Sequence, residues 1–309
     1  MKIFIVYNLY KLKGNFGDII LTIVIVTDSA SDILWDFAAE KGVKIVPISV
    51  SYYGKTYQEN SDYDFDKHFK LYETDDNFLP KTTQPSPKEF LEAYEKAIGE
   101  GARHIITVCI SSALSGTINS ANVAKKMIES KYEKVEVHII DSKNASYAEG
   151  FLVEEILESI KKGLGIDRIL ENLKVLVKRV KSFILLPTLK YLHLGGRIST
   201  PKYLLARLLR KKVITKTNEK GELKPAGTFS KLEEGLEEMI KLTMEGEERM
   251  PRKVAIVYAN DLSLRDKLQA LVAEKIPNAV QRIVRTRASI SAHVGPRAIA
   301  LISDFGFED

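Results

Sequence analysis

The first 180 residues alternate between apolar, β-branched runs and segments of helical character, with short connections between them. Strands buried on both faces are expected at four runs, residues 22–27, 43–50, 104–110 and 135–140. The best-marked helix begins at Ser86, where Pro87 at N1 and Glu89 at N3 complete a capping box. This alternation predicts an α/β fold with a parallel sheet covered by helices.

The order of elements changes beyond residue 187. Strand, strand, helix, strand, helix, strand and strand are expected between residues 213 and 303, which predicts a smaller α+β part on a mixed sheet. We therefore expect three parts in the chain. They are an N-terminal extension at 1–21, an α/β domain at 22–187 and an α+β domain at 188–309.

Composition fits a two-domain globular protein and excludes several other classes. The chain has 309 residues, 45% of them hydrophobic and 28% charged. A net charge of +5 gives no reason to expect nucleic acid as a partner. The single cysteine excludes an intrachain disulfide and fits a reducing compartment. The apolar stretch at 19–26 is too short to cross a membrane, and nothing resembles a cleavable signal, so we expect a cytoplasmic protein.

Several catalytic signatures are missing from the sequence. It contains no G-x-x-x-x-G-K-[ST], G-x-G-x-x-G or G-x-S-x-G motif, so the common nucleotide-binding and α/β-hydrolase patterns are absent. The five histidines never lie four residues apart, and H-E-x-x-H does not occur. We therefore expect no metal site and no catalytic residues.

The positive signal comes from polar loops that directly follow predicted strands, at residues 28–32, 111–117 and 141–146. The carboxyl ends of parallel strands meet at one edge of a sheet, so these loops should lie side by side. Their hydroxyls, and those at 81–86, can simply cap helices and close turns, and residues 28–32 are expected to cap a helix at 33–41. Several such loops at one edge also favour a site for an anion or a carboxylate.

Two further side chains are candidates for that site. Arg197 follows two glycines, whose freedom permits a tight turn that could aim the guanidinium inward. His293 lies in a polar stretch that we expect to form a turn between two apolar strands. A surface charge and a structural histidine are the plainer interpretations of these two residues.

Five segments, taken together, resemble the DegV family of fatty-acid-binding proteins. They are VTDSASD at 26–32, TTQPS at 82–86, ISSALSGT at 110–117, LKYLHLGGRIS at 189–199 and HVGP at 293–296. Their order and spacing match the family over about residues 22–305. The chain departs from the family pattern in its extension at 1–21, in Thr83 where serine is usual, and in Arg297 where glycine is usual.

The resemblance implies a two-domain DegV-like fold that holds one long-chain fatty acid, such as palmitate or oleate, in an inter-domain tunnel. It implies a lipid-binding protein without cofactor, not an enzyme, which presents the carboxylate to a partner fatty acid kinase in lipid transport or fatty acid metabolism. The carboxylate-binding positions implied by the resemblance are Thr82 and Ser112, with Thr83 and Ser111 as alternatives one residue away. The supporting head-group residues are Ser29, Arg197 and His293.

The physical requirements of a fatty acid suit this hypothesis. Each buried methylene contributes about 0.8 kcal/mol, so roughly 14 of them offer about 11 kcal/mol before ordering costs. The carboxylate needs donors, because an unpaired buried charge costs several kcal/mol.

Two other functions remain open: an enzyme acting on a small carboxylated or phosphorylated metabolite, and an interaction module with an empty cleft. The basic stretch at 207–212 also predicts a transient contact with an anionic membrane surface or the kinase, or simply a solvated helix face.

Overall fold

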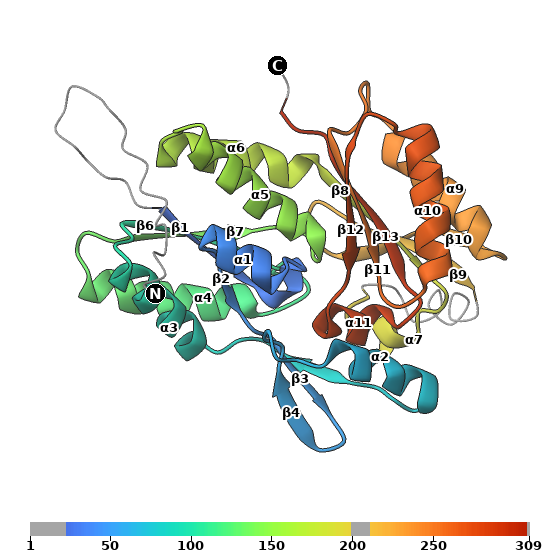
Figure 1. The fold of residues 1–309 in the computed structure, drawn as a ribbon, viewed down its shortest axis with the longest axis horizontal. Helices are drawn as coiled ribbons and strands as arrows, with labels where there is room; N and C mark the ends of the chain where they lie inside the picture. Colours follow the sequence, from blue (N-terminus) through green and yellow to red (C-terminus); the bar gives the residue numbers. More distant parts are fainter. Residues whose placement is uncertain (1–22, 199–210, 308–309) are drawn as a thin grey trace, which may run out of the picture.

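The computed structural model describes residues 23–198 and 211–307, and Figure 1 shows their arrangement. The first sheet is wholly parallel and has the strand order β2-β1-β6-β7. Its strands are β1 (Ile23–Asp28), β2 (Lys44–Val46), β6 (His104–Cys109) and β7 (Glu136–Asp141). This sheet confirms the predicted parallel architecture of the N-terminal part.

Helices cover both faces of this parallel sheet. The side chains that alternate along its strands are therefore buried on both sides. The helices α3 (Pro87–Gly99) and α4 (Thr117–Lys131) cover one face. The helices α1 (Trp35–Lys41), α5 (Tyr147–Lys161) and α6 (Ile166–Arg179) belong to the core on the other. The predicted capping box of Ser86 and Glu89 is present at the start of α3.

The second sheet is mixed and has the order β10-β9-β8-β13-β11-β12, in which only β11 and β12 run parallel. Its strands are β8 (Val180–Leu186), β9 (Lys212–Thr217), β10 (Leu223–Phe229), β11 (Lys253–Tyr258), β12 (Val280–Arg285) and β13 (Ile299–Asp304). The helices α9 (Leu232–Met244) and α10 (Leu262–Lys275) pack on one face. The mixed α+β part is therefore confirmed.

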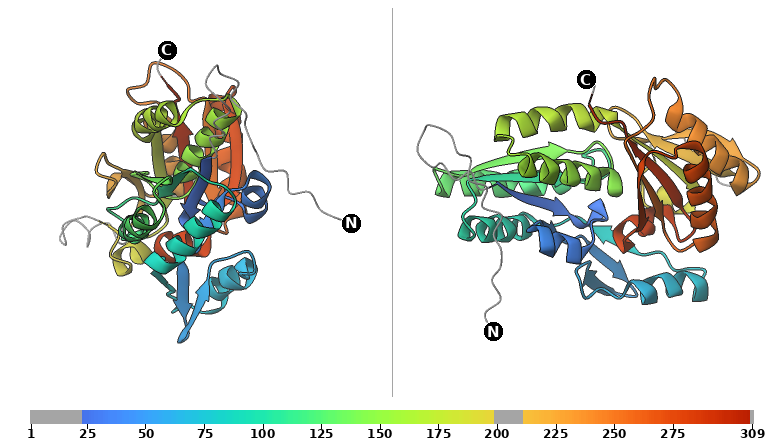
Figure 2. Two further views of the ribbon diagram at one scale, coloured as in Figure 1. Left: turned by 90° about the vertical axis from the view of Figure 1, so that its left-hand side faces the viewer. Right: turned by 45° about the horizontal axis from the view of Figure 1, so that its top comes forward.

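The long helix α5 lies between the two sheets, where its side chains contact both (Figures 1 and 2). Its apolar residues share one core with Ile25 of β1, Ile106 of β6 and Ile302 of β13. Helix α5 therefore joins the parallel sheet to the mixed sheet through a single hydrophobic core.

A small antiparallel sheet with the order β4-β3-β5 lies beside the helices α2, α7 and α11 (Figure 1). The bounds of these elements are β3 (Ser49–Tyr52), β4 (Lys55–Gln58), β5 (Lys81–Thr83), α2 (Phe65–Thr74), α7 (Lys190–Leu194) and α11 (Ala288–Val294). The turn at Tyr53 and Gly54 joins β3 to β4 in an antiparallel hairpin. Sequence analysis did not predict α2 or β5.

Three local expectations were wrong. The run at 43–50 forms two strands in different sheets, β2 and β3, separated by Pro47, which has no N–H to donate to a ladder. Residues 28–32 do not cap the next helix: they contain the short 3₁₀ helix η1 (Ser29–Ser31), and α1 begins later, at Trp35. His293 lies in α11 and not in a turn.

Strand β8 lies before the expected division at 187 and hydrogen-bonds with β9 and β13 of the mixed sheet. The division itself stays a prediction. The extension at 1–21 lies outside the described residues, as do Arg207 and Arg210 of the basic stretch. None of the described helices combines the length and the apolar character needed to span a bilayer.

Candidate functional site

The polar loops that follow β1, β6 and β7 meet at one edge of the parallel sheet, as predicted. The Ile110 amide donates to Asp28 Oδ2 at 2.9 Å, which ties the loop after β6 to the loop after β1. The Ser111 amide donates to the Asn144 carbonyl at 2.8 Å, which ties it to the loop after β7. These bonds use backbone groups that the strands leave unpaired at their ends.

A cavity of about 440 Å³ opens beside these loops, between the parallel sheet and the mixed sheet. Apolar side chains from the mixed sheet and from α7 and α11 form much of its wall: Ile184, Leu192, Val257, Val294, Ile299, Ala300 and Ile302. The lining extends from Ala298, just before β13, to Ile302 within it, about 13 Å at the usual rise of a strand. The volume falls in the range of small-molecule sites.

Polar side chains also line this cavity, among them Asn144, Ser146, Ser182, Thr217, Thr286 and Ser289. Six others come from four segments that hydrogen bonds join: Thr82 and Thr83 of β5 with Gln84 after it, Ser115 before α4, Arg197 after α7, and His293 of α11. We call these six residues the polar end. Gln84 Nε2 donates to the Gly116 carbonyl at 3.1 Å, which joins the first two segments. The Arg197 guanidinium donates to the Leu114 carbonyl at 3.3 Å, which joins the third.

Thr82 and His293 form the central contact of the polar end, with 2.8 Å between Thr82 Oγ1 and His293 Nε2. Burial, and secondarily the charge of Arg197, lowers the pKa of His293 to about 4, so the imidazole is neutral at pH 7. Its Nδ1 atom is buried and has no partner among the described residues. A neutral ring can hold the Thr82 hydroxyl in a fixed orientation without adding a charge.

The His293 ring depends on the absence of a side chain at Gly195. A Cβ atom built there would lie 2.3 Å from His293 Nδ1, far inside van der Waals contact. The close approach of the imidazole therefore explains why position 195, the first of the Gly-Gly-Arg segment, is a glycine. This glycine brings the α7 backbone against the imidazole.

Replacing Gly195 with alanine is expected to push His293 away from Thr82 and to destabilise the fold by about 1–3 kcal/mol through overpacking. Urea unfolding measures this change. Gly99→Ala is the control, because a Cβ atom there meets nothing within 4 Å and its φ is not positive. Equal stability of the Gly195 and Gly99 variants would show that the ring does not require this contact.

The three serines of the loop after β6 have different surroundings. Ser111 is buried, and its hydroxyl donates to the Gly221 carbonyl at 2.9 Å in the turn between β9 and β10. Ser112 is exposed and its amide donates to Asp141. Neither lines the cavity, whereas Ser115 does. The expected role of Ser112 or Ser111 at the head-group site therefore stays a prediction, which this cavity does not support.

Among the other expected site residues, Thr83 is exposed and lines the cavity, and Arg197 lines it from the loop after α7. Arg297, one of the departures from the family pattern, does not line the cavity. It is exposed, and its Nε donates to Asp261 Oδ2 at 2.9 Å. This family-atypical arginine is thus directed to the start of α10.

Ser29 does not line the cavity either, and it belongs to a buried carboxylate network that reaches the cavity through Ser289 and Thr286. Its hydroxyl donates to Glu59 Oε2 at 2.6 Å, and the same carboxylate accepts the amide and hydroxyl of Ser289 at 2.7 and 2.6 Å. Asp32 likewise accepts the Thr286 hydroxyl and the Arg287 amide, both at 2.8 Å. These bonds join the N-terminal part of the chain to the segment leading into α11.

Burial raises the pKa of Glu59 to about 7 despite its hydrogen bonds, so the folded protein holds this proton where the unfolded chain has lost it. The free energy of unfolding should therefore fall as the pH rises from about 4.5 to about 7, by up to about 1.4 kcal/mol per pH unit for this group. Glu59→Gln removes that dependence. Other titrating groups, such as His293, are common to both proteins.

The measurement is urea unfolding of the wild type and Glu59→Gln at intervals between pH 4.5 and 8. The stability of the wild type relative to the variant should decrease up to about pH 7 and stay level above it. A difference that does not change with pH would contradict a raised pKa at Glu59.

Sequence analysis missed Ser115 and Gln84. Both lie inside segments that had been singled out, and the spacing of the motifs did not distinguish Ser115 from the hydroxyls beside it. Gln84 could have been noticed, because it is the amide of the TTQPS segment and faces the loop at 110–117. Its Nε2 atom donates to Ser120 Oγ at 3.0 Å, as well as to the Gly116 carbonyl.

Known proteins are similar to this chain over most of its length. Residues 22–304 match the family model described as an uncharacterised protein of the DegV family. A DegV domain-containing protein of Staphylococcus aureus strain MRSA252 is 31% identical over 281 residues, 90% of this chain and 97% of that protein.

Two solved structures share the fold, each over 92% of this chain and 99% of its own. One is DegV from Bacillus subtilis, a fatty acid binding protein, with a TM-score of 0.82 and 25% identity. The other is a DegV family protein from Thermus thermophilus for which fatty acid binding is described, with a TM-score of 0.80 and 27% identity. Because both the sequence match and the structural match extend over nearly all of its length, this chain belongs to the DegV family.

Proposed function

We propose that this protein binds one long-chain fatty acid, such as palmitate or oleate, in the cavity between its two larger sheets. The observation that carries the proposal is the cavity itself, which combines apolar side chains of β13 and its neighbours with the polar end. The fatty acid binding described for the relatives from B. subtilis and T. thermophilus supports it. The hydrocarbon chain would follow the apolar wall and the carboxylate would lie at the polar end.

Thr82 and Ser115 are the proposed hydroxyl donors to the carboxylate. If His293 Nε2–H donates to Thr82 Oγ1, the Thr82 proton remains free for the ligand. Ser115 Oγ lies 2.8 Å from Thr117 Oγ1 and can accept that proton, which likewise leaves its own O–H free. Hydrogen bonds to an ionised acceptor are the strong ones, and they offset the cost of taking the charge out of water.

Arg197 supplies the only cationic side chain among the described residues that line the cavity. One guanidinium suits one carboxylate, whereas a phosphorylated metabolite would require more positive charge. The single cation argues against a phosphorylated metabolite and the apolar wall argues against a small carboxylated one, so the two observations together favour the lipid over an enzyme acting on either. We therefore propose a binding protein rather than an enzyme.

The second part of the proposal is that the protein presents the bound carboxylate to a partner fatty acid kinase. Thr83 and Gln84 are exposed and also line the cavity, so the polar end lies close to the surface. A carboxylate held there would be within reach of a partner that transfers a phosphoryl group. The role in lipid transport or fatty acid metabolism follows from that presentation.

Thermal unfolding of the delipidated protein tests this function. Palmitate at 100 times its Kd should stabilise the fold by about 2.7 kcal/mol, which raises the midpoint by several degrees. Hexanoate and inorganic phosphate, at the same concentration, should leave the midpoint unchanged. A rise with phosphate alone would favour the metabolite enzyme, and no rise with any ligand would favour an interaction module with an empty cleft.

A further inference from the structure

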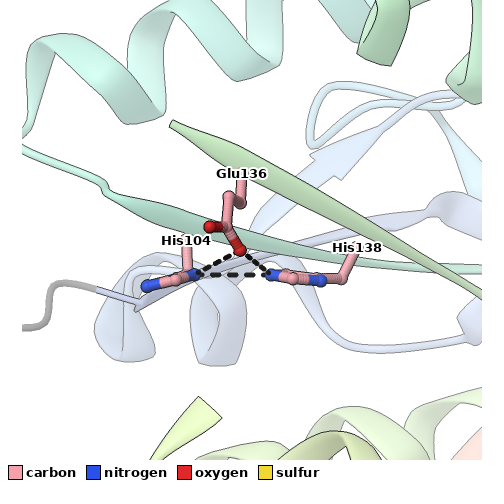
Figure 3. Close-up of side chains that lie close together, drawn as sticks. All are labelled: His104, Glu136 and His138. Carbon is pink, nitrogen blue, oxygen red and sulfur yellow. Dashed lines mark hydrogen bonds and ion pairs between the residues drawn. The ribbon is translucent and has the colours of Figure 1, made fainter. Parts of the chain in front are cut away.

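Two histidines and a glutamate converge at the start of two strands in the parallel sheet. His104 is the first residue of β6, and Glu136, the first residue of β7, is its direct partner in the ladder. His138 follows Glu136 by two residues, so both project from the same face of β7. Figure 3 shows the three side chains pointing toward one another.

This cluster is separate from the cavity. The polar loops that border the cavity follow the carboxyl ends of β1, β6 and β7, whereas the cluster lies at the opposite ends of β6 and β7. The length of β6 separates the two places by about 17 Å. Any ligand of this cluster is therefore distinct from the proposed fatty acid.

The distances within the cluster are those of metal ligands. His104 Nδ1 lies 3.4 Å from His138 Nε2, and Glu136 Oε2 lies 3.6 Å from each of these nitrogens. In a tetrahedral zinc site, bonds of about 2.0–2.1 Å place neighbouring ligand atoms about 3.3–3.4 Å apart. Shifts of about 0.2 Å would therefore bring all three atoms onto one ion.

Hydrogen bonding within the cluster does not account for this arrangement. The carboxylate oxygen is 3.6 Å from each ring nitrogen, which is too long for a hydrogen bond. Two neutral imidazoles share at most one proton between the facing nitrogens, and here their contact is 3.4 Å long. The rings also stack nearly parallel, 5.6 Å apart. A cation between the three atoms would satisfy all of them together.

We propose that His104, Glu136 and His138 form a binding site for a divalent transition-metal ion, with Zn²⁺ as the best match. Two imidazoles and one carboxylate suit zinc, whereas Mg²⁺ and Ca²⁺ require a shell of oxygen ligands. The histidine side chains are 16% and 21% exposed and that of Glu136 is 66% exposed, so water can occupy the fourth position. A bound ion would tie the edge strand β7 to β6.

From the sequence we expected no metal site, because no two histidines lie four residues apart and H-E-x-x-H does not occur. The ligands proposed here come from neighbouring strands, and His104 and His138 are separated by 34 residues. Only the register of β6 against β7 brings them together. The sequence alone shows Glu-x-His on one strand, which is too short a pattern to indicate a site.

Titration calorimetry of the untagged, EDTA-treated and dialysed chain with ZnCl₂ tests the site. The wild type should bind one Zn²⁺ with a Kd in the micromolar range or below, and MgCl₂ should give no binding. His104→Gln and His138→Gln should each weaken zinc binding by at least 10-fold. His193→Gln is the matched control, since it removes an exposed histidine far from the cluster in the chain and should leave binding unchanged.

Cobalt gives a second measurement that does not depend on the variants. Co²⁺ added to the wild type should produce the strong visible absorption of a tetrahedral site, and Zn²⁺ should displace it. Unchanged palmitate binding by the variants would show that they fold. The proposal is wrong if the wild type binds no zinc, or if folded His104→Gln and His138→Gln proteins bind it as tightly as the control.

Discussion

Ser115→Ala should weaken palmitate binding by about 10- to 150-fold, because it removes a hydrogen bond to a charged group that is worth about 1.5–3 kcal/mol. The hydroxyl lies at the polar end, and in the proposed complex its loss would leave one carboxylate oxygen without that donor. The fold should be retained, since the residue is only half-buried and lies in the loop before α4. Fluorescence or calorimetric titration of delipidated protein measures the change.

Ser112→Ala is the matched control for this prediction. It is the same substitution, three residues away in the same loop, at a side chain that is exposed and does not line the cavity. Its affinity for palmitate should equal that of the wild type. If Ser112→Ala weakened binding and Ser115→Ala did not, the head group would lie where the resemblance first implied and not where the cavity is.

Ala300→Phe should reduce the affinity for palmitate by about 100-fold. Ala300 lies in the middle of the stretch of β13 that lines the cavity, next to Ile184 of β8 in the ladder. A phenyl ring there would occupy space that the hydrocarbon needs. Loss of room for about four methylenes costs about 3 kcal/mol, which corresponds to about 100-fold.

The loss of affinity in Ala300→Phe should depend on the length of the fatty acid. Dodecanoate, which has four methylenes fewer than palmitate, should lose much less affinity than palmitate in Ala300→Phe. Val280→Phe is the control, because it introduces the same ring into the same sheet at a side chain that is 50% exposed. Equal losses for both fatty acids, or no loss at all, would place the hydrocarbon elsewhere.

The main features of the fold could be predicted from sequence because they depend on local signals. The β-branched runs, the capping box at Ser86 and the changed element order after residue 187 all have direct counterparts in the structure. Helix α2 was missed although Phe65, Phe69 and Tyr72 recur at helical spacing in it. That segment covers a small sheet, which the alternating pattern of the larger sheet did not indicate.

The candidate site was predicted only in part, because long-range contacts decide which hydroxyl faces the cavity. The bond from Ser111 to the Gly221 carbonyl spans 110 residues of chain, and no sequence motif indicates it. The Gly295-Pro296 pair was interpreted as a turn around His293. It follows the end of the short helix α11, where Gly295 has a φ of 84°.

Native mass spectrometry of the purified protein, followed by extraction and identification of any lipid, tests the central proposal most directly. We expect one long-chain fatty acid per chain in the wild type, retained by Ser112→Ala and depleted in Ala300→Phe. A wild-type protein that carries no lipid and takes up none when mixed with palmitate or oleate would contradict the account.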